Sequence, residues 1–281
     1  MRVPVPRPPA IARKALLPIR SCPPEALASV RGVLTDLDGT LTTDGTLGPE
    51  AYAALAALKE AGLFVAVVTG RPAGFGELVA RAFPVDACIV ENGGLCFQRD
   101  RRGRLVRRYY RPDAAGRTAD RRRLVRLCEK VCTATGARLS GDSRYTEVDL
   151  AIDWHEDVRL SRRTAGEIER RCRAAGASAV RSSIHVNVWY GGFDKRSAAF
   201  ALLSEVAGAK LPRDVARFAY VGDAPNDAPM FGAFPLSFGV ADVLSSFSAA
   251  SDLLPPPTYV TRARGGRGFC EVAAAILLAK G

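Results

Sequence analysis

Histidine is nearly absent from this chain of 281 residues. The only two, His155 and His185, belong neither to an HExxH motif nor to a zinc-type spacing. The chain also has no GxSxG motif, no GxxxxGK[ST] loop and no GxGxxG after an apolar run. These absences argue against zinc hydrolases, serine hydrolases of the GxSxG type, P-loop enzymes and dinucleotide-binding enzymes.

Long apolar runs are also missing. No segment reaches 18 uninterrupted apolar residues, so we expect no membrane-spanning helix. The seven cysteines are odd in number and include no CxxC pair, which is typical of reduced, mostly buried thiols in a cytoplasmic protein. Residues 1–29 are rich in proline and arginine, and their apolar stretches are too short for a signal peptide. We expect this segment to be a mobile arm or a strap lying on the core.

Lysine and acidic residues are few beside arginine. The net charge is +11, with 34 arginines and six lysines, and residues 99–126 hold twelve arginines against three aspartates. Such a cluster could bind nucleic acid by counterion release or steer an anionic substrate towards a cleft. Because arginine and alanine are abundant in the whole chain and few aromatics lie in the cluster, a compositional explanation is favoured. We therefore predict no nucleic-acid partner and no membrane partner.

Two aspartates, Asp36 and Asp38, follow the apolar run 30–34, where a strand is expected to end. Side chains at i and i+2 share one side of an extended segment, and two unpaired carboxylates there repel each other. A bound cation relieves that repulsion, and Gly39 and Thr40 let the chain turn and present backbone N–H groups to an anion. The stretch predicts a metal-dependent site in which one aspartate attacks and the other moves protons. The alternative is a solvated turn with an Asx motif.

Three further polar segments stand in similar contexts. The run 63–68, typical of a parallel strand buried on both faces, ends in Thr69-Gly70-Arg71. A second run, 217–221, ends in the segment Gly222–Asp227, and Lys195 opens a helical stretch. Taken singly, each of these features is usually structural. Their order and local context are specific when taken together.

In this order, the segments resemble the four motifs of the haloacid dehalogenase-like (HAD) superfamily of phosphotransferases. The resemblance implies an α/β fold with a doubly wound, parallel, Rossmann-like sheet. Residues 94–189, inserted between the second and third motifs, resemble the large α/β cap of the branch with sucrose-phosphate, trehalose-phosphate and mannosyl-phosphoglycerate phosphatases and eukaryotic phosphomannomutases. The predicted organisation is an arm at 1–29, a catalytic core at 30–93 and 190–281, and an α+β cap at 94–189.

The resemblance also implies roles for single residues. Asp36 would be the nucleophile that takes the phosphoryl group as an aspartyl phosphate. Asp38 would protonate the leaving alcohol and then activate water. Thr69 would hydrogen-bond a phosphoryl oxygen, and Lys195 would neutralise charge on the nucleophile and the phosphate. Dehalogenases of the superfamily lack the acid two residues after the nucleophile, so Asp38 favours phosphoryl transfer.

The implied cofactor is Mg²⁺. Asp223 would hold it together with the carboxylate of Asp36 and the carbonyl of Asp38, with Asn226 and Asp227 supporting from nearby. Mg²⁺ prefers oxygen ligands and usually keeps several waters, so few carboxylates suffice. Phosphoryl transfer needs in-line placement and charge neutralisation more than unusual functional groups, and these residues supply both.

Periodicity predicts alternating helices and strands. The expected helices are 49–61, 74–83, 119–133, 161–175, 196–206 and 270–280. The expected strands are 30–34, 63–68, 86–90, 148–154, 179–190, 217–221 and 236–240, with a hairpin of 95–98 and 105–110 assigned to the cap. The glycine-rich stretch 264–268 is predicted to be a loop.

The cap is expected to set specificity, because the core recognises only phosphate and metal. In the alternating strand 179–190, Ser183, His185 and Asn187 share one face with Trp189. That face could read sugar hydroxyls or could be an ordinary solvent-exposed face. Asn92, at the predicted junction of core and cap, is a substrate or hinge candidate.

Further candidates follow the second motif. Gly70 and Arg71, directly after Thr69, are placed to contact an anion, although Arg71 could equally pair with a carboxylate. Asp142 and Arg144 lie in the loop before the middle strand of the cap.

The predicted function is Mg²⁺-dependent hydrolysis of a small phosphorylated metabolite, most simply a sugar phosphate. Two alternatives stay open: a phosphosugar mutase that uses the same aspartyl phosphate, and a basic polyanion-binding protein without catalysis on the same fold. The oligomeric state and the identity of the substrate are left open by the sequence.

Overall fold

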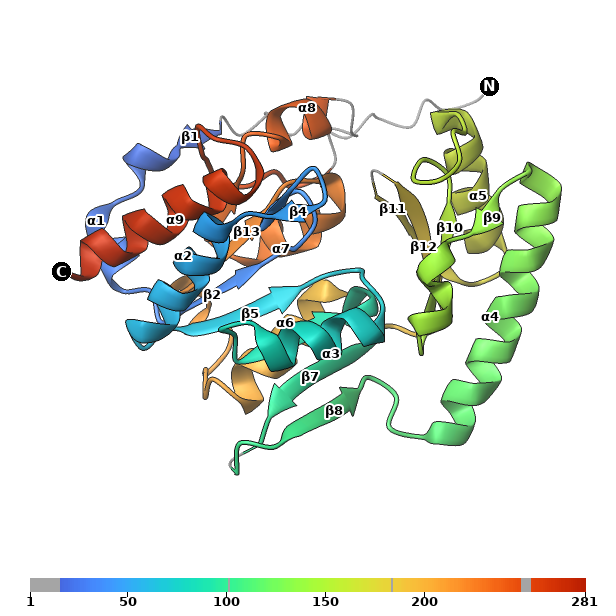
Figure 1. The fold of residues 1–281 in the computed structure, drawn as a ribbon, viewed down its shortest axis with the longest axis horizontal. Coiled ribbons are helices and arrows are strands. Elements are labelled where there is room, and N and C mark those ends of the chain that lie inside the picture. Colours follow the sequence, from blue (N-terminus) through green and yellow to red (C-terminus); the bar gives the residue numbers. More distant parts are fainter. Residues whose placement is uncertain (1–15, 101, 183, 249–253) are drawn as a thin grey trace, which may run out of the picture.

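The computed structural model describes residues 16–100, 102–182, 184–248 and 254–281 (Figure 1). Among them, one sheet of nine strands forms the larger body and a sheet of four strands forms the smaller one. We call the first the core sheet and the second the cap sheet. Residues 1–15 of the predicted arm, and Ser183, lie outside the described residues.

The core sheet is parallel over most of its width. Its order is β1 (Leu17–Pro18), β15 (Tyr259–Val260), β14 (Leu236–Gly239), β13 (Phe218–Gly222), β2 (Gly32–Thr35), β5 (Phe64–Val68), β6 (Ala87–Val90), β7 (Leu95–Arg99) and β8 (Leu105–Tyr109). Among the described strands of this sheet, the antiparallel pairs are β6 with β7 and β7 with β8. Every residue of β2, β13 and β6 is buried, as expected when helices cover both faces.

Helices cover the two faces of the core sheet. On one face pack α1 (Pro24–Ala28), α2 (Pro49–Glu60), α3 (Ala73–Ala82) and α9 (Gly265–Lys280); on the other pack α6 (Lys195–Glu205), α7 (Ala228–Ala233) and α8 (Val243–Ser248). Alternate strand residues serve the two faces: Val33 and Val65 pack with the first group, whereas Leu34 and Ala66 pack with the second. This arrangement confirms the predicted doubly wound α/β fold.

The cap sheet is antiparallel and lies beside the carboxyl end of the core sheet, on the right of Figure 1. Its order is β11 (Ser178–Arg181), β12 (His185–Trp189), β10 (Asp149–Asp153) and β9 (Arg138–Leu139), with α4 (Ala114–Thr135) and α5 (Arg162–Ala174) packed on one face. Leu150, Ile152, Val186 and Val188 are buried against those helices. The opposite, more polar face of the sheet is therefore available to the core.

The hairpin of β7 and β8 corrects the expected extent of the cap. It was assigned to the cap, whose predicted start was residue 94. Instead β7 pairs with β6, so the hairpin continues the core sheet. The reason is the short connection through Glu91–Gly93, which turns the chain straight back along β6. The cap elements begin after β8, with α4.

Two local predictions were wrong. The segment 179–190 is not one strand but two, β11 and β12, which pair with each other in the antiparallel sense around a turn that begins at Ser182. The glycine-rich stretch 264–268 is not a loop but the first turn of α9. Its glycines allow close packing, because a Cβ on Gly266 would lie 2.8 Å from the carbonyl oxygen of Leu41.

The segment that precedes β2, described from residue 16 onwards, packs on the core. β1 pairs with β15 at the edge of the core sheet, and α1 packs against α9. After β2, the small hairpin of β3 (Thr42–Thr43) and β4 (Thr46–Leu47) stands over the start of α9, where Thr43 accepts a hydrogen bond from the Gly266 N–H. These contacts hold both ends of the described chain on the core.

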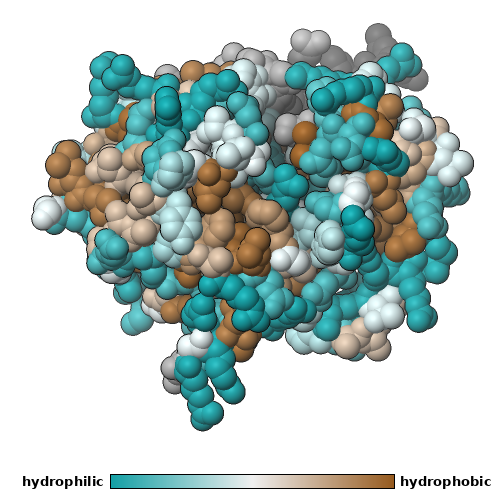
Figure 2. Space-filling model, viewed as in Figure 1, coloured by the Kyte–Doolittle hydropathy of each residue, from teal (hydrophilic) through white to brown (hydrophobic). Residues whose placement is uncertain are grey.

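The arginines of α4 lie on the outer side of the cap. Arg122, Arg123 and Arg126 are exposed, and hydrophilic side chains cover much of this side of the molecule in Figure 2. Hydrophobic side chains gather nearer the middle of that view, over α2 and α3, where Tyr52, Phe75 and Leu78 are exposed. The helices in the described part of the chain do not combine the length and apolar character that a membrane span requires.

Candidate active site

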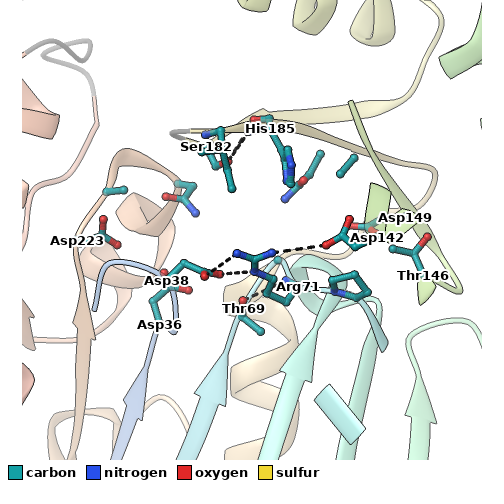
Figure 3. Close-up of a pocket in the computed structure, with 17 residues that line it drawn as sticks. Asp36, Asp38, Thr69, Arg71, Asp142, Thr146, Asp149, Ser182, His185 and Asp223 are labelled. Carbon is teal, nitrogen blue, oxygen red and sulfur yellow. Dashed lines mark hydrogen bonds and ion pairs between the residues drawn. The ribbon is translucent and has the colours of Figure 1, made fainter. Parts of the chain in front are cut away.

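The predicted motifs meet at the carboxyl end of the core sheet. Asp36, Thr69 and Asp223 each follow a strand directly, and those strands, β2, β5 and β13, are parallel neighbours. The carboxyl ends of parallel neighbours share one edge of a sheet, which is where open α/β sheets bind ligands. Here that edge and the polar face of the cap sheet enclose one pocket (Figure 3).

Lys195 fixes the nucleophile candidate from behind. Its Nζ lies 2.8 Å from Asp36 Oδ1 and 2.8 Å from Asp227 Oδ1, and its side chain is almost fully buried. Burial lowers the pKa of Lys195, but the charges of Asp227 and Asp36 outweigh that effect and raise it above the ordinary value. Within the described residues, no hydrogen bond reaches Asp36 Oδ2. That oxygen is therefore free to attack a phosphorus atom, while Oδ1 is held in place.

Carboxylate oxygens of Asp36, Asp223 and Asp227 lie within 4.8 Å of one another. Burial raises the pKa of Asp36 to about 7 despite Lys195, and burial together with the charge of Asp36 raises that of Asp223 well above its usual value. Two buried carboxyl groups and a half-buried one cannot all carry charge at low cost beside a single ammonium group. A hard divalent cation with oxygen ligands would relieve that cost, so the donor set fits Mg²⁺.

The three carboxylates are not equivalent. Asp227 already has partners on both oxygens: Tyr220 and Lys195 donate to Oδ1, and the N–H groups of Asp223 and Ala224 donate to Oδ2. Asp223 receives only the hydroxyl of Thr40, at 3.2 Å. The spare lone pairs for a cation are therefore on Asp36 and Asp223. Asp227 holds Lys195 and the backbone of the loop after β13, and its supporting role at a metal stays a prediction.

Two smaller features complete this side of the pocket. Asn226 lines it with a buried Oδ1 that has no hydrogen-bond partner in the described structure. Gly39 has a φ of +78°, and a Cβ there would lie 2.7 Å from Asp223 Oδ2. A glycine at this position thus lets the loop after β2 turn and lets Asp223 approach it.

Asp38 does not point towards the acidic cluster. Its carboxylate accepts two hydrogen bonds from Arg71, at 2.9 Å each, in a bidentate pair. Arg71 also lies 3.6 Å from Asp142 (Figure 3). It lies 4.0 Å from Glu156, which belongs to the cap as Asp142 does. Of the two alternatives for Arg71, the carboxylate pair matches its contacts. Because both carboxylate oxygens of Asp38 are bonded to Arg71, Asp38 would contact a cation through its backbone carbonyl.

Thr69 and Gly70 shape the floor of the pocket. Thr69 is buried, and its Oγ1 accepts a hydrogen bond from the N–H of Arg71, which leaves the hydroxyl proton free for a ligand. A Cβ on Gly70 would lie 2.7 Å from the Nδ2 of Asn187. The amide of a cap residue therefore rests over the loop that follows β5.

Comparisons with known proteins agree with this arrangement. A family model described as haloacid dehalogenase-like hydrolase matches residues 33–120, which include Asp36, Asp38 and Thr69. Over these residues the chain is similar to that family. A search of curated proteins gave no match.

Several solved structures share the fold across both sheets. A Thermoplasma acidophilum protein superposes with a TM-score of 0.68 at 19% identity, covering 89% of this chain and 99% of its own. A HAD superfamily phosphatase from Bacteroides thetaiotaomicron gives 0.58 at 20%, covering 92% and 96%. The sucrose-phosphatase of Synechocystis sp. PCC6803 gives 0.61 at 15%, covering 88% and 98%. At these identities the likeness is one of fold.

Glu91 joins the cap to the core. It lies fully buried after β6, and its carboxylate accepts hydrogen bonds from the N–H groups of Ala73 in the core and of Glu147, Val148 and Asp149 in the cap. Glu91 and its neighbour Asn92 both have positive φ, at 49° and 58°. Left-handed backbone in two successive non-glycine residues is strained and persists only where its surroundings enforce it. We infer that this turn fixes the cap over the pocket.

Replacing Glu91 by alanine is expected to lower the free energy of unfolding by about 3 kcal/mol, since hydrogen bonds to a charged group are worth about 1.5–3 kcal/mol each and cap N–H groups would be left buried. Urea denaturation measures the loss. Glu77→Gln, at a half-buried position of α3 whose carboxylate pairs with Arg81 and Arg107, is the matched control and should lose no more than about 1 kcal/mol. A Glu91→Ala protein as stable as that control would show that the clamp is not needed.

The candidates predicted in the cap and at its junction with the core lie in different places. His185 and Asn187 line the pocket, and His185 Nε2 lies 2.8 Å from Glu156 Oε2. Trp189 instead donates to the carbonyl oxygen of Phe193 at the chain's return to the core. Asp142 lines the pocket, whereas the Arg144 guanidinium lies over the Tyr145 ring. Asn92 is held beside the pocket through its hydrogen bond to Asp149.

Sequence reasoning missed several contributors: Thr40 and Tyr220 as partners of the acidic cluster, and Glu91, Asp149 and Glu156 at the cap. Glu91 could have been found, because it follows the apolar run of β6 in the same way that Asp36 follows β2. Thr40, Asp149 and Glu156 carry no such signal, because their partners lie 29 or more residues away. Tyr220 lies inside the apolar strand β13, where it reads as a core residue.

Proposed function

We propose that this HAD protein is a Mg²⁺-dependent phosphomonoester hydrolase acting on a small phosphorylated metabolite, with a sugar phosphate as the favoured substrate class. The observation that carries the proposal is the free Oδ2 of Asp36, held by Lys195 beside a cation-ready pair of carboxylates. The names of two structural neighbours, a sucrose-phosphatase and a trehalose-6-phosphate phosphatase related protein, support it.

The chemistry proceeds in two displacements at phosphorus. In the first, Asp36 Oδ2 forms a bond to phosphorus while the bond to the substrate oxygen breaks, and protonated Asp38 delivers a proton to that oxygen. In the second, Asp38 takes a proton from a water that attacks phosphorus and releases Asp36. Lys195 and the hydroxyl of Thr69 stabilise charge on the transferring group.

A bound Mg²⁺ would neutralise phosphoryl charge that Lys195 alone does not balance. Asp36 and Asp223 would hold it through carboxylate oxygens and Asp38 through its carbonyl, with Asn226 alongside. For its proton transfers, Asp38 must leave the bidentate pair with Arg71 at least in part. The contacts of Arg71 with Asp142 and Glu156 tie that release to the position of the cap.

Hydrolysis is favoured over the mutase alternative by the charge of the pocket. A mutase must hold a bisphosphorylated sugar, whose second phosphate needs a cation of its own. Among the described residues that line the pocket, Arg71 is the only arginine or lysine. Its guanidinium is already paired with Asp38 and Asp142. Phosphate release without a bisphosphate activator would separate the two reactions.

The polyanion-binding alternative is weakened by the partners of the arginine cluster. Arg107 pairs with Glu147, Arg111 with Asp120, and Arg117 lies over the ring of Tyr109. Several of these side chains therefore serve internal contacts rather than a continuous open patch. The seven unpaired cysteines support the proposed cytoplasmic location.

A phosphate-release screen across sugar, polyol and nucleotide monophosphates tests the proposed function. We expect turnover of several sugar or polyol phosphates, and no turnover after treatment with EDTA. Adding Mg²⁺ in excess should restore the rate, because the acidic cluster is then neutralised again. Full activity in metal-free buffer would contradict the role given to Asp223. Release from nucleotides alone would contradict the substrate class.

A further inference from the structure

Asp149 of the cap lines the pocket, and one of its carboxylate oxygens has no hydrogen-bond partner among the described residues. It is the first residue of β10 and is 1% exposed. Its Oδ2 accepts a hydrogen bond from Asn92 at 3.0 Å, whereas its Oδ1 is buried and has no partner among the described residues. Leaving a buried polar atom unpaired costs about 1–3 kcal/mol, so this oxygen is placed to receive a group from a ligand.

The neighbours of Asp149 suit a hydroxylated ligand. Ala151 lies two residues on in β10 and opposite Asn187 of β12, so the three side chains project from one face of the cap sheet. All three line the pocket, and the small side chain of Ala151 leaves space between the carboxyl and the amide. Burial and the charge of Glu91 raise the pKa of Asp149 well above its usual value. A hydroxyl both donates and accepts, so it satisfies either protonation state.

Charge on the cap side of the pocket is acidic. Asp142 and Asp149 stand together in Figure 3, and Glu156 reaches His185 and Arg71. The guanidinium of Arg71 is divided between Asp38 and these carboxylates. A second anionic group on the substrate would meet like charges here and find no free cation among the described lining residues.

We propose that Asp149 selects the leaving group: its Oδ1 pairs with a hydroxyl of a polyhydroxylated fragment, and the acidic cap wall rejects a fragment with a carboxylate or a second phosphate. The proposal rests on the proposed phosphomonoesterase activity and narrows its substrate class. Asp149 thereby determines specificity and takes no part in the displacements at phosphorus.

Matched substrate pairs test the charge preference on the unaltered protein. Glycerol 3-phosphate and 3-phosphoglycerate differ only in a hydroxymethyl group against a carboxylate, as do glucitol 6-phosphate and 6-phosphogluconate. We expect kcat/KM to be at least about 10-fold higher for the hydroxymethyl member of each pair, because like-charge contacts penalise the other. Equal values, or a preference for the carboxylates, would overturn the proposal.

Substitutions test the residue itself. In Asp149→Asn and Asp149→Ala, we expect the ratio of kcat/KM for glucitol 6-phosphate to that for p-nitrophenyl phosphate to fall by about 10-fold or more. Glu167→Gln removes a cap carboxylate that pairs with Arg171 on α5, away from the pocket, and should leave the ratio within about twofold. An unchanged ratio in both Asp149 variants would overturn the assignment even if their absolute rates fell.

Failure of the wider proposal looks different. If the protein were no phosphomonoesterase, p-nitrophenyl phosphate would release no phosphate with Mg²⁺ present, and neither would any matched pair. If only the inference about Asp149 were wrong, p-nitrophenyl phosphate would be hydrolysed while the pairs showed no charge preference. The matched pairs require no variant, so a misfolded Asp149 substitution leaves the test intact.

Discussion

Replacing Asp36 by asparagine is expected to abolish phosphate release, with a loss in kcat of at least about 10³-fold. The amide keeps the size of the side chain but has no anionic oxygen to attack phosphorus. It also removes the charge that pairs with Lys195 Nζ, 2.8 Å away, and one of the two carboxylates with spare lone pairs for a cation. Phosphate release under saturating Mg²⁺ measures the effect.

A control is needed because Asp36 is buried and its loss also disturbs an ion pair. Asp157→Asn removes an exposed carboxylate of the cap that pairs with Arg138, and it should keep the full rate. Circular dichroism should show both variants folded. If folded Asp36→Asn kept even a tenth of the parent rate, another group would have to be the nucleophile.

Asp38→Asn and Asp223→Asn are expected to separate proton transfer from metal binding. The Asp38 carboxylate is bonded to Arg71 and turned from the acidic cluster, so its loss should cost about 10²–10⁴-fold in kcat, as for a general acid and base. The affinity for Mg²⁺ should stay within a few-fold, since the main chain carbonyl is unchanged. Asp223→Asn should instead weaken Mg²⁺ binding strongly, because Asp223 offers a half-buried carboxylate with free lone pairs.

Metal titration of the two variants, followed by calorimetry without substrate, distinguishes the roles. Equal losses of affinity in both would contradict the division between them. A further expectation concerns the leaving group: p-nitrophenolate needs little protonation, so Asp38→Asn should be less impaired in the first displacement with that substrate than with an alkyl phosphate.

The core site could be predicted from the sequence because each of its residues adjoins a strong local pattern. Asp36, Thr69 and Asp223 follow continuous apolar runs, and parallel strands bring their carboxyl ends to one edge. Lys195 is the first residue of a helix that Asp194 caps, so its place was also readable locally. For these positions the order of segments and the geometry of a parallel sheet are enough.

The cap side could not be predicted in the same way. The alternating segment is divided into β11 and β12 after Arg181. The period of two continues in both strands, so the pattern of side chains does not reveal the break between them. The pairing of Arg71 with Asp142, or of Glu91 with backbone of the cap, depends on how the two bodies dock. Contacts between the cap and the core join residues that are tens of positions apart in the sequence. The local periodicity of the sequence does not predict such contacts.

The hairpin of β7 and β8 shows the same limit at the scale of domains. Its composition suits either sheet, and only the tight turn at Glu91–Gly93 sends it back along β6. Three successive residues with positive φ form that turn, and only the last, Gly93, is a glycine. Gly93 marks a turn in the sequence, but it does not show which sheet the following hairpin joins. The same turn holds the cap through Glu91, which links the extent of the core to the shape of the pocket.

Trapping the covalent intermediate tests the central claim most directly. Asp38→Asn incubated with p-nitrophenyl phosphate and Mg²⁺ should accumulate the phosphoryl enzyme, because the first displacement then needs no acid while the second still lacks its base. After an acid quench and digestion, mass spectrometry should locate one phosphoryl group on the peptide that contains Asp36, and none in Asp36→Asn/Asp38→Asn. A phosphoryl group on another residue, or p-nitrophenol released in the first turnover without any adduct, would contradict the account.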